Sequence, residues 1–205
     1  MQQFRKQCRT FFDTLWPAEE KTLVFGQGKA DHPRVMLIGE APGEQETLEG
    51  KPFVGKAGKN LDGFLQTLSL HREDIYITNV VKIRPTKTSA KGTVSNRPPN
   101  QEELLLFTPY LYQEILLVQP DVIVTLGNVA LRALLGDKAA IGACHGRMAQ
   151  AFVSHEGEER AFDVFPLYHP ASIIYNRSLK EVYQGDLHLL KALLDTRADK
   201  GSGVV

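Results

Sequence analysis

Three polar side chains in this sequence, Glu40, Asn79 and His169, have the chemistry that a catalytic site needs, and each follows a short apolar run. A carboxylate such as Glu40 can orient a water molecule or stabilise a developing positive charge. The Asn79 amide offers both a hydrogen-bond donor and an acceptor, so it can recognise the edge of a planar ligand. The His169 imidazole can donate a hydrogen bond to an anion that develops during bond cleavage.

The elements that must position these residues are four apolar runs, which are short enough and β-branched enough to be strands buried on both faces. These runs span residues 35–38, 75–78, 122–126 and 164–167. Helical patterns lie over residues 58–68, 101–118, 128–135 and 179–194, and Asn100 and Glu103 form a capping box at the second of them. Strands that alternate with helices predict an α/β fold with a parallel sheet covered on both faces. Residues 147–162 are less regular, and a hairpin turn at 155–158 would add an edge to the sheet.

The polar residues follow the carboxyl ends of these strands, where ligands bind in open α/β sheets. Each of them also has a purely structural interpretation. Asn79 could cap a turn, His169 could be a structural histidine, Phe53 could be core, and Gly39 and Gly43 could only permit a tight turn. It is less probable that all four features near strand ends are purely structural than that they share one ligand-binding cleft.

Two other kinds of site find little support. Gly43 and Gly50-Lys51 resemble a phosphate-binding loop, but six residues separate the glycines where four are required. Pro52 also stands where that motif needs Ser or Thr to hold magnesium. Because no Cys and His residues lie at metal-binding spacing, we expect no metal site.

The length of 205 residues predicts a single domain over residues 1–205, with the motifs between about 24 and 194. Hydrophobic residues make up 42% of the chain, which suffices for a core, but no apolar run approaches the ~20 residues that cross a membrane. The two cysteines and the absence of an apolar leader predict a protein of the reducing cytoplasm. We expect a monomer without an obligate protein partner.

The formal net charge is zero, which argues against a protein that coats nucleic acid over its whole surface. No acidic residue lies between Asp74 and Glu102, however, and this stretch holds five basic residues. They are Lys82, Arg84, Lys87, Lys91 and Arg97. The stretch is either a local basic face that contacts a nucleic-acid backbone or an ordinary solvated loop.

Several long motifs occur in order along the chain. Residues 39–46 read GEAPGEQE and residues 50–58 read GKPFVGKAG; TNVVK at 78–82 precedes NRPP at 96–99, DVIVTLG follows at 121–127, and HPA stands at 169–171. This sequence resembles the family-four uracil-DNA glycosylases over roughly residues 24–194.

The resemblance implies a three-layer α/β/α domain around a four-stranded, mainly parallel sheet. It also implies a DNA repair enzyme that flips uracil out of DNA, hydrolyses its N-glycosidic bond and leaves an abasic site. Phe53 would stack on the flipped base, Asn79 would read the edge of the base, and His169 would donate to the uracil O2. Glu40 would orient the water or stabilise the cationic sugar.

The same resemblance assigns further contacts with the substrate. Ala41 and Gly43 would line the pocket for the base and the water, and Glu46 would border the C5 edge of uracil and help to exclude thymine. Ile173 and Ile174, in the stretch after His169, would wedge into the duplex. DNA that contains uracil is therefore the expected partner.

One departure from the family concerns its iron–sulfur members, which bind a cluster through four cysteines. This chain has Ile83 at one of those positions and no cysteine in residues 101–118, so we expect no cofactor. Apolar packing around Ile83 and Phe107 would replace the stabilisation that a cluster gives. Two alternatives remain: a glycosylase for another deaminated base, and a non-catalytic nucleic-acid-binding relative.

Overall fold

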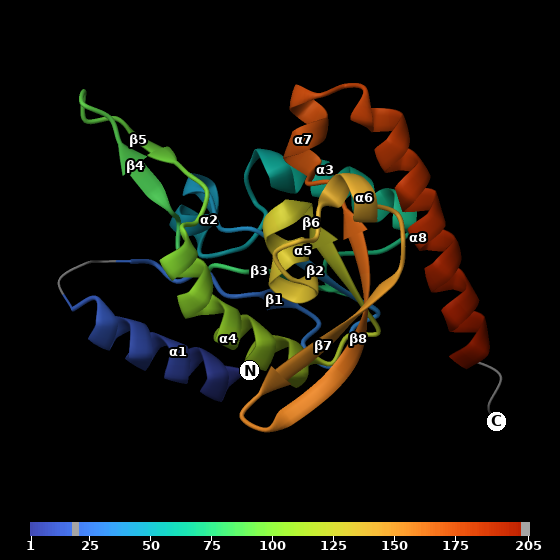
Figure 1. Ribbon diagram of the computed structural model, residues 1–205, viewed down its shortest axis with the longest axis horizontal. Helices are drawn as coiled ribbons and strands as arrows, with labels where there is room; N and C mark the ends of the chain where they lie inside the picture. The colour runs from blue at the N-terminus through green and yellow to red at the C-terminus, as the bar shows by residue number, and fades with distance from the viewer. Residues whose placement is uncertain (18–20, 202–205) are drawn as a thin grey trace.

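A six-stranded sheet forms the centre of the computed structural model, which describes residues 1–17 and 21–201 (Figure 1). The strands are β1 (Gln27–Gly28), β2 (Val35–Gly39), β3 (Tyr76–Asn79), β6 (Val122–Leu126), β7 (Ala149–His155) and β8 (Glu158–Leu167). Their order across the sheet is β1-β3-β2-β6-β8-β7. The four central strands run parallel to one another, so the predicted α/β class and the four predicted strands are confirmed.

The sheet is wider than the predicted four strands because an antiparallel strand lies at each edge. β1 pairs with β3 through only two residues, a segment too short to leave a pattern in the sequence. At the other edge, β7 and β8 form a hairpin whose turn residues, Glu156 and Gly157, both have positive φ. Two-residue hairpin turns of the type that matches strand twist require this conformation. The predicted hairpin turn and added edge are therefore confirmed.

Helices cover both faces of the sheet and produce three layers (Figure 1). They are α1 (Gln2–Leu15), α2 (Glu44–Glu49), α3 (Lys56–Leu68), α4 (Gln101–Val118), α5 (Gly127–Leu135), α6 (Ile141–Cys144), α7 (Pro170–Tyr175) and α8 (Leu179–Gly201). Helices α1, α4 and α5 share one apolar core with the sheet, and α3 and α8 share the other. Within the described residues, no helix is both long enough and apolar enough to span a membrane.

The core beneath α1 and α4 contains the two apolar residues that were expected to pack in place of a cluster. Ile83 and Phe107 are both buried there, and the Phe12 ring stacks on Phe107 with 4.6 Å between ring centroids. Burial raises the pKa of the Cys8 thiol on α1 to about 12, so this thiol stays protonated. Across the part of the chain that the structure describes, no group of three or more His, Cys, Asp and Glu residues could hold a metal ion.

A small hairpin of β4 (Thr86–Thr88) and β5 (Val94–Asn96) leads from the sheet into α4 and projects from the body of the domain (Figure 1). Helix α4 begins with the predicted capping box. The Glu103 main-chain N–H donates to the Asn100 side chain, and the Asn100 N–H donates to the Glu103 carboxylate, each over 2.8 Å. The cap fixes where the chain turns from the hairpin into the helix.

Candidate active site

Strands β2, β3 and β8 end at one edge of the sheet, and a pocket of about 470 Å³ opens there. Gly39 at the end of β2 pairs with Asn79 at the end of β3, and His169 follows the end of β8 by two residues. Six residues that were predicted to act on the substrate line this pocket: Ala41, Gly43, Glu46, Phe53, Asn79 and His169. An amide, an aromatic ring and an imidazole therefore meet in one cavity.

Gly39 is needed for close approach rather than for a tight turn. A Cβ at this position would lie 2.5 Å from both Asn79 Oδ1 and Phe53 Cζ, which is closer than a carbon atom can approach either of them without a bond. The missing side chain leaves room for the ring and the amide to lie against the end of β2.

Phe53 is held in a backbone conformation that few residues adopt. Its φ is +55°, in the left-handed region, where a residue with a large side chain is strained. Arg72 donates from Nη2 to the Phe53 carbonyl over 2.9 Å and to the Gly58 carbonyl over 3.1 Å. The Arg72 guanidinium therefore supports the turn that directs the ring into the pocket, a role that the sequence did not suggest.

The Glu46 carboxylate ties together the two loops that form one wall of the pocket. Its Oε2 accepts from the Gly43 N–H over 3.1 Å, and its Oε1 accepts from the Val54 and Gly55 N–H groups over 3.0 and 2.7 Å. Glu46 is only 9% exposed. The carboxylate thus has a loop-bracing function in addition to the place on the pocket wall that was predicted for it.

His169 caps the first turn of α7 with its own ring. Its Nδ1 accepts from the Ala171 N–H over 3.2 Å, which leaves the ring proton on Nε2. Burial lowers the pKa of His169 below its ordinary value of 6.5, so the ring is neutral at pH 7. The ring lies 6.2 Å from that of Phe53, with 28° between the ring planes.

Glu40 directly follows the end of β2 and is half-buried, but it is not among the residues that line the pocket. Burial raises the pKa of its carboxyl above the ordinary 4.5. Its main-chain carbonyl accepts from the Val81 N–H over 3.0 Å, which joins the loop after β2 to the loop after β3. The pocket wall itself is formed by the neighbouring Ala41.

Asn96, at the end of β5, is a pocket residue for which the sequence suggested no role. Its Oδ1 accepts from Arg84 Nε over 2.7 Å, so its NH₂ group remains available to donate. A Cβ on Gly43 would lie 3.4 Å from that nitrogen, so the amide reaches the wall of the pocket. The signal in the sequence was its place in the NRPP motif, inside the basic stretch.

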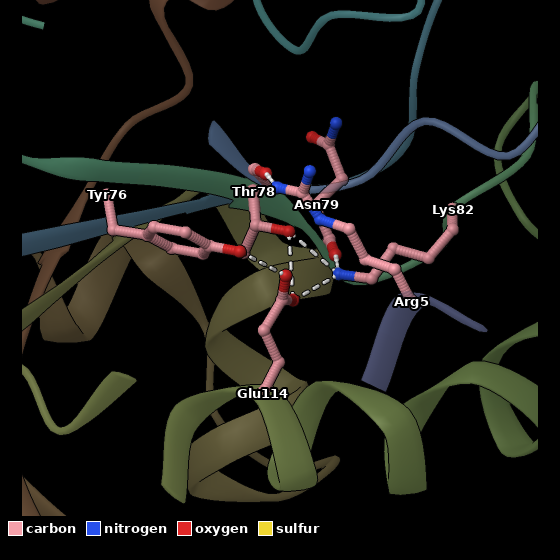
Figure 2. Close-up of polar contacts among 7 residues, drawn as sticks. Arg5, Tyr76, Thr78, Asn79, Lys82 and Glu114 are labelled. Carbon is pink, nitrogen blue, oxygen red and sulfur yellow. Dashed lines mark hydrogen bonds and ion pairs between the residues drawn. The ribbon is translucent and has the colours of Figure 1, made fainter. Parts of the chain in front are cut away.

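Lys82 does not belong to the basic surface, and the prediction that it contacts DNA is wrong. Its side chain is 1% exposed, and its Nζ lies 2.6 Å from Glu114 Oε2 inside the protein (Figure 2). An ammonium group enclosed in this way cannot reach a phosphate without opening the core.

The other four basic residues lie on or beside the β4–β5 hairpin. Lys87 and Lys91 are exposed, and Arg84 also reaches Glu44 over 3.3 Å. Arg97 forms two hydrogen bonds of 2.7 Å with Glu103, which raise the pKa of Arg97 and lower that of Glu103.

The predicted wedge lies on α7. The half-buried Ile173 packs against the core beneath α3 and α8. The side chain of Ile174 lies outside the described residues.

Comparison with known proteins identifies the family of this chain. Residues 25–194 match the model of the uracil DNA glycosylase superfamily, and this chain therefore belongs to that superfamily. Among its relatives, the Type-4 uracil-DNA glycosylase of Saccharolobus solfataricus is 37% identical over 184 residues, which cover 89% of this chain and 81% of the relative. The Type-4 enzyme of Pyrobaculum aerophilum is 38% identical over 171 residues, 82% of this chain and 81% of the relative.

A solved structure supports the fold independently. The crystal structure of Pedobacter heparinus SMUG2 matches 80% of this chain and 77% of its own chain with a TM-score of 0.52. At 15% identity, this likeness concerns the fold alone.

Proposed function

We propose that this protein is a uracil-DNA glycosylase that hydrolyses the N-glycosidic bond of uracil in DNA and leaves an abasic site. The observation that carries the proposal is the meeting of Phe53, Asn79 and His169 in one pocket at the carboxyl edge of the sheet. A base inside a duplex cannot be attacked, so the uracil must first be extruded into this pocket.

Two residues recognise the extruded base. The Phe53 ring offers a flat apolar face on which the base stacks, and such stacking offsets part of the cost of extrusion. Uracil presents an acceptor at O4 and a donor at N3–H, and the Asn79 amide supplies the complementary NH₂ and carbonyl groups. Asn79 is only 3% exposed, so a base bound there exchanges its hydrogen bonds with water for bonds to the protein.

His169 stabilises the leaving group. Cleavage leaves negative charge on the uracil, and the Nε2–H of a neutral His169 can donate to O2 as that charge develops. The Ala171 N–H holds the ring in the required tautomer. A fixed donor of this kind contributes ~10²–10³ in rate.

Glu40 provides the carboxylate that orients the attacking water or stabilises the positive charge on the sugar. The main-chain carbonyl of Ala41, on the pocket wall, is the other group that can position this water.

DNA backbone contacts are proposed for Arg84, Lys87, Lys91 and Arg97 on the hairpin side of the pocket. Ile173 and Ile174 on α7 are proposed to fill the space that the extruded base leaves.

A glycosylase assay tests the function. The protein is incubated with otherwise identical oligonucleotides that carry uracil, thymine or hypoxanthine, and abasic sites are then cleaved with alkali. We expect strand breaks at uracil only, with the same yield in the presence of a chelator. Breaks at hypoxanthine in place of uracil would indicate a different deaminated base, and DNA binding without any breaks would indicate a non-catalytic relative.

A further inference from the structure

A closed cluster of polar side chains lies inside the domain directly beside Asn79 (Figure 2). Lys82 donates through Nζ to three acceptors: Glu114 Oε2 over 2.6 Å, Thr78 Oγ1 over 2.7 Å and the Asn79 main-chain carbonyl over 2.6 Å. An ammonium group has three hydrogens, so these bonds use all of them.

Glu114 closes the cluster from the side of helix α4. Its Oε1 accepts from the Tyr76 hydroxyl over 2.8 Å, and its Oε2 accepts from the Thr78 hydroxyl over 3.0 Å in addition to Lys82. Burial, together with Glu114, raises the pKa of Tyr76, so its hydroxyl keeps the proton that it donates. Lys82 and Glu114 are 1% and 0% exposed.

Stability alone does not explain such a cluster. Removing two charges from water is expensive, and a well-packed apolar pair of similar volume is often equally stable or more stable. The location of the cluster is more informative, because its one main-chain contact is to the residue that reads the base. The peptide group between Asn79 and Val80 is thereby held at both of its polar atoms. Lys82 donates to its carbonyl oxygen, and its N–H, which belongs to Val80, donates to the Gly39 carbonyl over 2.9 Å.

We propose that Lys82 is a positioning residue, held in place by Glu114, that fixes the end of β3 so that the Asn79 amide meets the extruded base. This inference rests on the proposed role of Asn79. Without Lys82, the last carbonyl of β3 loses its partner and the strand end can shift. Catalytic geometry is sensitive to such shifts, since a displacement of about 1 Å can cost about 10²-fold in rate.

The test uses the double variant Lys82→Met/Glu114→Gln, which removes both charges together and leaves neither buried and unpaired. Single-turnover release of uracil should fall about 10²-fold. The affinity for a duplex that already contains an abasic site should not change, because the basic residues of the hairpin remain. A crystal structure of the variant should show Asn79 displaced from its position in the parent.

A matched control removes a hydrogen bond of α4 outside the cluster. Tyr112→Phe removes a part-buried 2.7 Å bond from α4 to the Ala133 carbonyl, and it should keep the parent rate.

A parent-like rate in the double variant, or a reduced rate with Asn79 in its original position, would overturn the proposal. If the double variant does not fold, Lys82→Met/Glu114→Leu decides in its place: it replaces the ion pair by apolar side chains, which buried pairs often tolerate, and it also removes the donor to the Asn79 carbonyl, so a parent-like rate overturns the proposal again. If the parent itself releases no uracil, the proposed function fails, while the position of Asn79 in the variant still decides this inference.

Discussion

At the scale of single residues, the pocket depends on groups that are constrained before any ligand arrives. Phe53 is in a left-handed conformation, Gly39 cannot carry a side chain, and the His169 ring is fixed in one tautomer. Donors that are already oriented need no reorganisation as charge develops in the transition state. The constraints on these residues therefore favour catalysis over simple binding.

Replacement of Asn79 or His169 by Ala should reduce the rate of single-turnover uracil release by orders of magnitude. For His169→Ala we expect a reduction of about 10²–10³-fold, because the variant loses one fixed hydrogen-bond donor. Far-ultraviolet circular dichroism and the melting temperature should stay close to the parent values. His188→Ala, at an exposed position on α8, is the control and should keep the parent rate. Near-normal rates in a well-folded Asn79 or His169 variant would show that the residue has another role.

The pH dependence of the rate of uracil release should reflect the lowered pKa of His169. A lowered pKa means that the neutral ring predominates at pH 6.5 and above, and that it is lost only on further acidification. Protonation of Nδ1 would also break the bond from the Ala171 N–H. Uracil release should therefore stay level from about pH 8 to 6.5 and then fall. An NMR titration of the ring with a midpoint at or above 6.5 would contradict this assignment.

At the scale of elements, the β4–β5 hairpin places basic residues beside the pocket, and their effect should depend on salt. Lys87→Ala and Lys91→Ala should each reduce the slope of log affinity against log salt by about one unit if each lysine contacts one phosphate. Lys29→Ala is the control, because Lys29 is exposed near the opposite, amino end of β3. If both hairpin variants keep the parent affinity for DNA and the parent salt dependence, the hairpin is a solvated surface that does not contact the DNA backbone.

The elements that leave a periodic pattern were predictable from the sequence, and those defined by tertiary contacts were not. The four parallel strands, the capping box of α4 and the hairpin turn follow from local patterns. The spacing of Phe4, Cys8 and Phe12 on α1 was also visible, although the prediction did not use it. The burial of Lys82 could not be read from its neighbours, since its partner Glu114 lies 32 residues away on another element. The basic residues near Lys82 in the sequence predicted an exposed side chain, whereas the ion pair with Glu114 lies in the interior.

At the scale of the whole molecule, the contact between α1 and α4 should contribute much of the stability on that face. Phe107→Ala should lower the free energy of unfolding by about 3–5 kcal/mol, because a fully buried ring that stacks on Phe12 is lost. Leu105→Ala, two residues along α4 and 68% exposed, should change it by less than about 0.5 kcal/mol. Urea denaturation measures both. Equal effects in the two variants would contradict the assigned core.

The purified protein should be colourless, without an absorbance band near ~400 nm and without stoichiometric iron. A cubane cluster needs four thiolates, and the chain has two cysteines, of which Cys8 is buried in the core beneath α1 and α4. Iron and sulfide in anaerobically purified protein would contradict this prediction.

The strand order also has a consequence for synthesis on the ribosome. β8, which leads to His169, is the last strand of this sheet to be made, and it pairs with β6 in the middle of the sheet. A nascent chain that stops before β8 therefore exposes an unpaired edge of β6 composed almost entirely of apolar residues, and such edges attract other chains. Premature termination would thus give a product that is prone to aggregate and that lacks His169.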